Sequence, residues 1–230
     1  SLNLFVSSNA DALTTPIPAR LQRILALRGM RSPDSWAQAQ QRKGHRRMFI
    51  NNEERFVNKK IYQSAQQQYF INNQGVSSFD AFNKILHIVS VHDIELKLII
   101  SPIHAYQLKI IHDEGQWGSF LEWKSELVSS VNGNNLKHNR NDEIWDFSGF
   151  YTVSMESIPP LNSKQPMTWY WEAQHYKEEL GDKVLDIIFE RRPAEINGKP
   201  FGAKIDGSIV TEHNSDLDDL SKRYLPLFAL

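Results

Sequence analysis

Short apolar runs that change abruptly to small polar residues recur along this chain. They lie at residues 2–6, 96–100 and 144–150, and their length and composition are typical of buried β-strands. Asn9 follows the first run after two serines, and Ser101 directly follows the second. Ligands of open α/β sheets bind at the carboxyl ends of the strands. We therefore expect these polar residues to gather at one edge of a single sheet.

Helical periodicity separates the predicted strands. One face of residues 77–92 is apolar, and its positions are Phe79, Phe82, Ile85, Leu86 and Val89. The pattern also predicts helices over residues 33–47, 103–131 and near 180–188. Gly115 is expected to break the second of these, and residues 132–135 are expected to form a turn. Strands that alternate with helices indicate parallel βαβ order and a three-layer sandwich.

The last part of the chain differs from the rest. We expect residues 1–192 to form one α/β domain, and residues 193–230 to be an extension with a closing helix at 216–228 that packs on the domain or on a partner. A second distinct feature is the basic run at residues 42–47. Such a run is typical either of a contact with an anionic polymer or lipid headgroup, or of a solvated helix end, where cations suit the helix dipole.

Composition narrows the classes of protein. Hydrophobic residues make up 40% and charged residues 23% of 230 positions, which indicates a globular chain. The net charge is −1 with the cations spread out, so nucleic acid is not an expected partner. Cysteine is absent, which excludes disulfides and thiolate metal sites and suits an oxidising compartment such as the periplasm. There is no run of about 18 apolar residues, so no segment is predicted to span a membrane.

The candidate chemistry lies in residues 169–176, Trp-Tyr-Trp-Glu-Ala-Gln-His-Tyr. Glu172 stands three residues before His175, within an aromatic segment. A carboxylate beside a histidine orients the imidazole, which can then take a proton from a hydroxyl nucleophile and return it to a leaving group. The same pattern is also typical of a buried aromatic cluster with a hydrogen-bonded histidine.

The order of these blocks resembles a known family. The blocks are Ile-Ile-Ser-Pro-Ile-His-Ala (99–105), Phe-Leu-Glu-Trp-Lys (120–124), Trp-Asp-Phe-Ser-Gly (145–149) and Tyr-Trp-Glu-x-x-His-Tyr (170–176). They resemble the C-terminal part of the SGNH (GDSL-like) proteins of the bacterial cell envelope. More distant members O-acylate alginate or take part in the D-alanylation of lipoteichoic acid. The family carries its last block as Asp-x-x-His, and Glu172 stands here in place of the aspartate.

The resemblance implies a flavodoxin-like three-layer α/β/α fold with a mainly parallel sheet. It also implies a serine esterase or acyltransferase that needs no cofactor and acts on an envelope polysaccharide or lipid, in the periplasm or at the outer face of the inner membrane. The family's nucleophile sits in a Gly-Asp-Ser block, which this sequence lacks. We therefore expect the first strand, the nucleophile and any membrane anchor to lie upstream, and these residues alone to be inactive.

Other polar residues have two interpretations each. As oxyanion or substrate ligands we consider six residues: Asn9, Ser101, His104, Asp146, Ser148 and Trp171. His104 is equally compatible with a capping role, and the Asp-x-Ser sequence at 146–148 is often a turn that satisfies the backbone. Tryptophans more often pack in a core than stack on sugars. No histidine spacing indicates a metal site, and no glycine-rich loop indicates a nucleotide site.

Three classes of function remain, and the third is a partner-binding module that uses the basic run at 42–47 and the tail and requires an exposed apolar patch on residues 193–230. In the first, His175 and Glu172 catalyse ester hydrolysis or acyl transfer, which requires an open cleft with an exposed His175. In the second, the protein is a non-catalytic binding or scaffolding module, in which the two residues are packed together and sealed from solvent.

Overall fold

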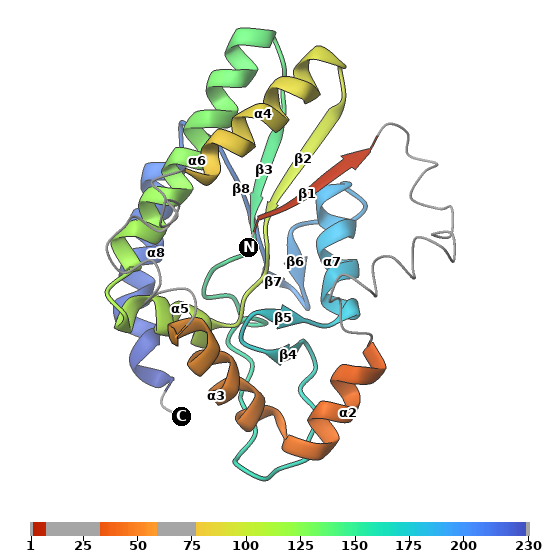
Figure 1. Ribbon diagram of the computed structural model, residues 1–230, viewed down its shortest axis with the longest axis vertical. Helices are drawn as coiled ribbons and strands as arrows, with labels where there is room; N and C mark the ends of the chain where they lie inside the picture. The colour runs from red at the N-terminus through yellow and green to blue at the C-terminus, as the bar shows by residue number, and fades with distance from the viewer. Residues whose placement is uncertain (1, 8–32, 59–76, 229–230) are drawn as a thin grey trace.

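A mixed sheet forms the centre of the computed structural model, which describes residues 2–7, 33–58 and 77–228 (Figure 1). Within these residues the sheet order is β1–β2–β3–β8, formed by Leu2–Ser7, Glu95–Ile100, Glu143–Asp146 and Ala203–Ile205. Strands β2 and β3 are parallel, whereas β1 and β8 run antiparallel to their neighbours. The α/β class is confirmed, but the expectation of a mainly parallel sheet is wrong.

The direction of β1 changes where its polar end lies. Ser7 pairs with Glu95 at the start of β2, whereas Ser101 follows the other end of β2. Ser7 therefore lies at the end of the sheet opposite Ser101, which contradicts the single polar edge expected from the sequence. The reason is that an apolar strand pattern is the same read in either direction. Asn9 lies outside the described residues.

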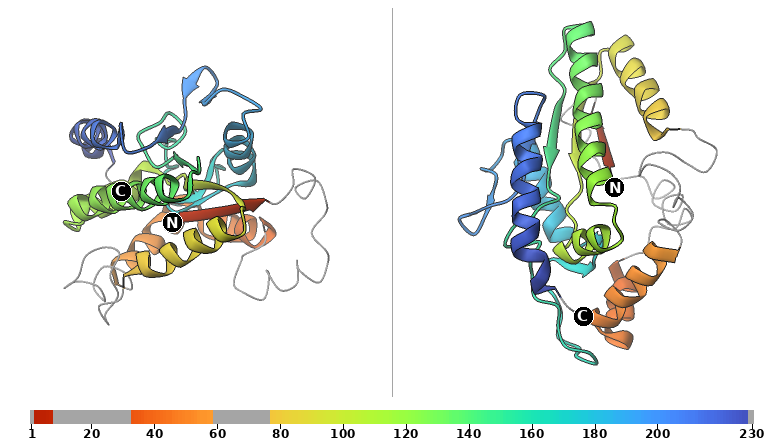
Figure 2. Two further views of the ribbon diagram at one scale, coloured as in Figure 1. Left: turned by 90° about the horizontal axis from the view of Figure 1, so that it is seen from above. Right: turned by 90° about the vertical axis from the view of Figure 1, so that its left-hand side faces the viewer.

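Helices cover both faces of the sheet (Figure 2). Helices α4 (Ser78–Val91) and α6 (Trp117–His138) pack on one face, and α7 (Glu178–Ile188) packs on the other. Each face has its own hydrophobic core. Leu98 lies in the core under α4 and α6, and its neighbour Ile99 lies in the core under α7. Successive strand residues point to opposite faces, so the apolar run of β2 is buried on both sides, as predicted.

The helical predictions succeed where the periodicity is strong. Helix α4 has the predicted bounds within one residue, and its Ser77 cap accepts a hydrogen bond from Phe79 N–H at 3.1 Å. The break at Gly115 is confirmed between α5 (Ala105–Asp113) and α6. The turn predicted at 132–135 is wrong, because α6 continues through it to His138. The buried face of α6 ends at Val131, just before that stretch.

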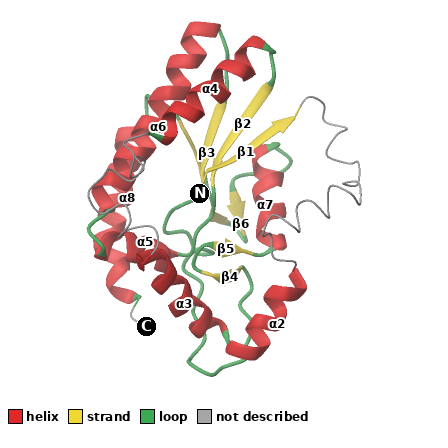
Figure 3. Cartoon of the chain, in the orientation of Figure 1, coloured by secondary structure: helices red, strands yellow, loops and turns green. Residues whose placement is uncertain are grey.

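The predicted helix over residues 33–47 is in fact two helices, α2 (Pro33–Lys43) and α3 (His45–Phe56). Gly44 separates them with φ +76°, a value that favours glycine. A Cβ atom on Gly44 would also lie 2.5 Å from the Ser163 carbonyl oxygen, so only glycine fits there. Figure 3 shows the long loop after β3 that passes this corner. The two helices therefore meet at an angle and enclose a space between them.

The strands after that loop are short. They form the hairpin β4–β5 (Tyr170–Glu172 and His175–Tyr176), the hairpin β6–β7 (Glu195–Ile196 and Lys199–Pro200) and the sheet strand β8. Helix α8 (Val210–Tyr224) and the 3-10 turn η4 (Leu225–Leu227) end the described chain. Residues 193–228 thus pack on the domain, and they also complete its sheet. Helix α8 begins six residues earlier than predicted. None of the described helices is long and apolar enough to cross a membrane.

Candidate functional site

The Glu172–His175 pair sits on the β4–β5 hairpin. The two residues are paired across its tight turn, with a register irregularity between Tyr170 and Glu172. Gln174 N–H donates to the Glu172 carboxylate at 3.3 Å and closes the turn. The three-residue spacing therefore brings the two side chains to the same side of a hairpin.

The pair has the geometry of an acid–base dyad. His175 Nδ1 is hydrogen-bonded to Glu172 Oε1. An ionised carboxylate only accepts hydrogen bonds, so Nδ1 carries the proton and Nε2 remains as the acceptor. The Glu172 side chain is 4% exposed, whereas that of His175 is 55% exposed. A buried acid thus orients an imidazole whose reactive nitrogen can be reached from outside.

Two buried histidines hold the backbone of the hairpin. The sequence motif did not indicate this role for either of them. His45, buried on α3, donates from Nδ1 to the Trp171 carbonyl at 3.0 Å, and its Nε2 accepts from Met167 N–H at 3.0 Å. Burial lowers the pKa of His45, which favours the neutral ring that these two bonds require. The backbone N–H of His104 donates to the Ala173 carbonyl within the turn at 3.0 Å. Both ends of the dyad hairpin are therefore fixed.

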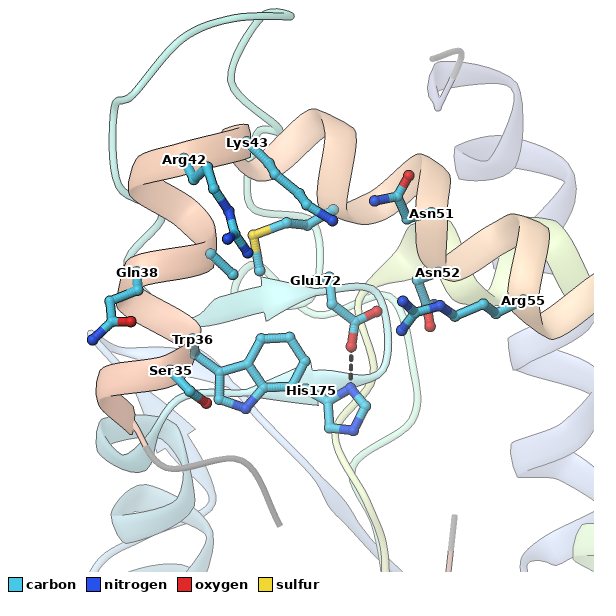
Figure 4. Close-up of a pocket in the computed structure, with 12 residues that line it drawn as sticks. Ser35, Trp36, Gln38, Arg42, Lys43, Asn51, Asn52, Arg55, Glu172 and His175 are labelled. Carbon is cyan, nitrogen blue, oxygen red and sulfur yellow. Dashed lines mark hydrogen bonds and ion pairs between the residues drawn. The ribbon is translucent and has the colours of Figure 1, made fainter. Parts of the chain in front are cut away.

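A pocket of about 300 Å³ adjoins the dyad (Figure 4). Residues of α2, α3 and the hairpin line it, namely Ser35, Trp36, Gln38, Ala39, Arg42, Lys43, Met48, Asn51, Asn52, Arg55, Glu172 and His175. The Trp36 ring lies 4.9 Å from the His175 ring between centroids and 6.4 Å from Trp171. The Trp171 ring stacks on that of Trp36 but is not part of the lining. Eight of the ten lining residues from α2 and α3 are polar or aromatic. The sequence did not indicate that they form a pocket, because they come together only in the folded chain.

His104 caps helix α5 and is fully buried. Its Nδ1 accepts from Tyr106 N–H at 3.1 Å, and Nε2 is 2.7 Å from the Glu156 carbonyl, to which it donates. The rings of Phe49 and Tyr170 pack edge-on against it. The sequence allowed either a ligand-binding or a capping role for His104. In the structure it caps α5 and does not line the pocket.

Asp146 and Ser148 form a separate buried cluster. Asp146 Oδ1 accepts from both the N–H and the hydroxyl of Ser148, at 2.8 and 2.7 Å, which is the turn that the Asp-x-Ser sequence allowed. Asp146 Oδ2 is 2.6 Å from Lys124 Nζ and 2.9 Å from His213 Nε2. Ser101 is also buried, and its side chain is hydrogen-bonded to Tyr176. Among the predicted site residues that the structure describes, Glu172 and His175 line the pocket, whereas Asp146 and Ser148 meet in a separate cluster.

No set of three histidine or carboxylate side chains in the described part of the chain is arranged to hold a metal ion. The pocket therefore has to be interpreted from its acid–base pair and its polar lining.

The buried His104 makes stability depend on pH. Burial lowers its pKa from 6.5 to about 4. The unfolded chain therefore binds a proton as the pH falls below about 6.5, while the folded protein does not until about pH 4. We expect the free energy of unfolding to fall by up to about 3 kcal/mol across this range. Urea denaturation at pH 7 and at pH 4.5 measures it.

The control variant is His104→Asn, which retains a capping acceptor and does not titrate. Its free energy of unfolding should be lower at pH 7 but should fall less on acidification. His45 shifts in the same direction in both proteins, so the difference between them isolates His104. Equal losses in the two proteins would assign the acid sensitivity elsewhere.

Comparison with known proteins finds no match for this chain among protein-family models, curated proteins or solved structures.

Proposed function

We propose that the protein carries out ester chemistry, as a hydrolase or an O-acyltransferase, with His175 as the general base and Glu172 as its orienting carboxylate. The observation that carries the proposal is the contrast in exposure within one hydrogen-bonded pair. A binding module without chemistry has no need to leave the imidazole open to a pocket. Here the acid is buried, and the base is 55% exposed at the pocket wall.

In this mechanism His175 Nε2 accepts the proton of a hydroxyl, of serine or of water, as its oxygen forms a bond to the acyl carbonyl carbon. Glu172 holds the ring through Nδ1–H and stabilises the imidazolium that results. When the tetrahedral intermediate collapses, the bond from carbon to the leaving oxygen breaks, and Nε2–H returns the proton to that oxygen. With a serine nucleophile, a second hydroxyl repeats the sequence and releases the acyl group.

The resemblance of the sequence blocks to SGNH proteins supports the same chemistry. On that basis we propose a flavodoxin-like SGNH fold and a serine nucleophile outside the described residues. The substrate is then an envelope polysaccharide or lipid, and the location is the periplasm or the outer face of the inner membrane. The helices on both faces of the sheet are compatible with such a fold, although β1 and β8 depart from its parallel order.

The test is made on the full gene product that contains these residues. A fluorophosphonate probe reports a reactive serine, and an aryl acetate reports hydrolysis. Labelling indicates a serine nucleophile, and hydrolysis without labelling indicates water. A folded protein that does neither contradicts the proposal.

The Glu172→Gln variant connects either activity to the dyad. We expect its rate to fall at least about tenfold, because a hydrogen bond to a charged group contributes about 1.5–3 kcal/mol and 1.4 kcal/mol is a factor of ten. Glu179→Gln is the matched control, since Glu179 is exposed on α7. Similar rates for the two variants would remove Glu172 from the mechanism.

A further inference from the structure

The cations in the pocket are not explained by acid–base chemistry. Arg42 and Lys43 come from the last turn of α2, and Arg55 comes from the last turn of α3. Figure 4 shows their side chains extending from the two helices toward the space beside Glu172. The helix dipole favours a cation at the end of each helix separately. It does not require cations of two helices to converge on one pocket.

These cations are not neutralised by neighbours. Within the part of the chain that the structure describes, none of the three forms an ion pair. Glu53 of α3 accepts a hydrogen bond from Tyr106 at 2.6 Å and is not part of the pocket lining. Among the described residues of the lining Glu172 is the one acid, and its carboxylate accepts hydrogen bonds from His175 and Gln174. The pocket is therefore electropositive.

The other lining groups suit an anion as well. Asn51 contributes a side-chain amide that can donate hydrogen bonds and adds no charge, and Asn52, whose amide also donates to Gln107 at 3.3 Å, lies beside it. Two guanidinium groups and an ammonium match the oxygens of a phosphate, since arginine binds such groups through two parallel hydrogen bonds. Three cations suit a doubly charged phosphate better than a single carboxylate. The volume of about 300 Å³ leaves room for part of the substrate beside it.

We propose that this pocket binds a phosphate group of the substrate and holds the scissile ester next to His175. The inference rests on the proposed function for its second half, whereas phosphate binding by the pocket stands without it. The phosphate can belong to a glycan or to a lipid headgroup, because the pocket chemistry is common to both.

Binding of inorganic phosphate tests the pocket directly. Trp36 lies in the lining, so tryptophan fluorescence at low ionic strength reports the titration. We expect saturable binding that is weakened about tenfold by Arg55→Gln and by Arg42→Gln, and weakened by added salt. Arg47→Gln is the matched control, because Arg47 is exposed on α3 and does not line the pocket. Its affinity should equal that of the wild type.

Two outcomes overturn the proposal: no saturable phosphate binding, or the same loss in Arg47→Gln as in Arg55→Gln. Measuring phosphate binding and ester activity separately on the same wild-type protein distinguishes this proposal from the catalytic one. Phosphate binding in a protein without any ester activity would leave the pocket assignment intact and refute the dyad.

A second arm identifies the source of the phosphate. Vesicles of phosphatidylglycerol in phosphatidylcholine are sedimented with wild type, Arg55→Gln and Arg47→Gln. Sedimentation that is lost only in Arg55→Gln indicates a lipid headgroup. Phosphate binding without sedimentation indicates a phosphate on a soluble glycan.

Discussion

Replacing Lys124 by alanine is expected to lower the free energy of unfolding by about 3–5 kcal/mol, because it leaves a buried carboxylate without its cation. The side chains of Lys124 and Asp146 are both 0% exposed, with Nζ 2.6 Å from Oδ2. Burial alone would raise the pKa of Asp146, but the charge of Lys124 and the hydrogen bond from His213 lower it well below its ordinary value. The carboxylate therefore stays ionised in the core, and Lys124 is its main counter-charge.

Urea denaturation at pH 7, followed by circular dichroism, measures this loss. Lys222→Ala is the control, because Lys222 pairs with Asp218 and Asp219 at the surface and its side chain is 66% exposed. Solvent screens such exposed pairs, so the loss from this variant should be small. Losses of equal size in the two variants would show that the buried pair adds nothing beyond a surface pair.

A double variant tests the cause of the loss. Adding Asp146→Asn to Lys124→Ala removes the uncompensated charge while keeping an oxygen that accepts from Ser148. It should be more stable than Lys124→Ala alone.

The pH dependence of this stability has a definite sign as well. Because the folded pKa of Asp146 is lowered, the stability from the pair is fully present above about pH 4, the pKa of an unfolded aspartate, and is lost as the pH falls further.

This cluster joins helix α8 to the rest of the domain. Lys124 comes from α6, Asp146 from β3 and His213 from α8, so the ion pair and its hydrogen bonds join three elements. Leu217 of α8 also lies in the main core. Truncation before α8 would therefore expose both the apolar contact of Leu217 and the buried charge of Asp146.

The fold was predictable where local periodicity and burial agree. The α4–β2 unit follows from the spacing of Phe79, Phe82 and Leu86 and from an apolar strand that is buried on both faces. The direction of β1 was not predictable, because it depends on pairing between residues far apart in the chain. Polar signals were ambiguous for a physical reason. A buried polar side chain must be hydrogen-bonded, so Asp146 and His104 resemble site residues while they cap and pair.

Part of the candidate site could be predicted from the sequence, and part could not. Glu172 and His175 are three residues apart, so a local motif predicts their contact. Trp36 and Arg55 reach the pocket from more than 100 residues away in sequence, through the corner that Gly44 creates. The basic run at 42–47 gave a signal, since an anionic contact was one of its two interpretations. Nothing in that run indicated which of its cations face the dyad.

Replacing His175 by alanine is expected to have the largest effect on chemistry. A positioned general base contributes about 10²–10⁴ in rate, so fluorophosphonate labelling or ester hydrolysis should fall by that factor. His87→Ala is the matched control, since His87 is exposed on α4 on the far side of the sheet from α7. Its rate should equal that of the wild type, and circular dichroism establishes that both variants are folded.

Rescue by imidazole distinguishes a base from a structural residue. Because the His175 side chain is 55% exposed beside a pocket of about 300 Å³, free imidazole can occupy the space that the alanine leaves. The rate of His175→Ala should rise with imidazole concentration and should follow the fraction of neutral imidazole as the pH changes. A folded variant that keeps the wild-type rate would show that His175 is not the base. A variant that loses activity without any rescue would point instead to a structural role for the ring beside Trp36.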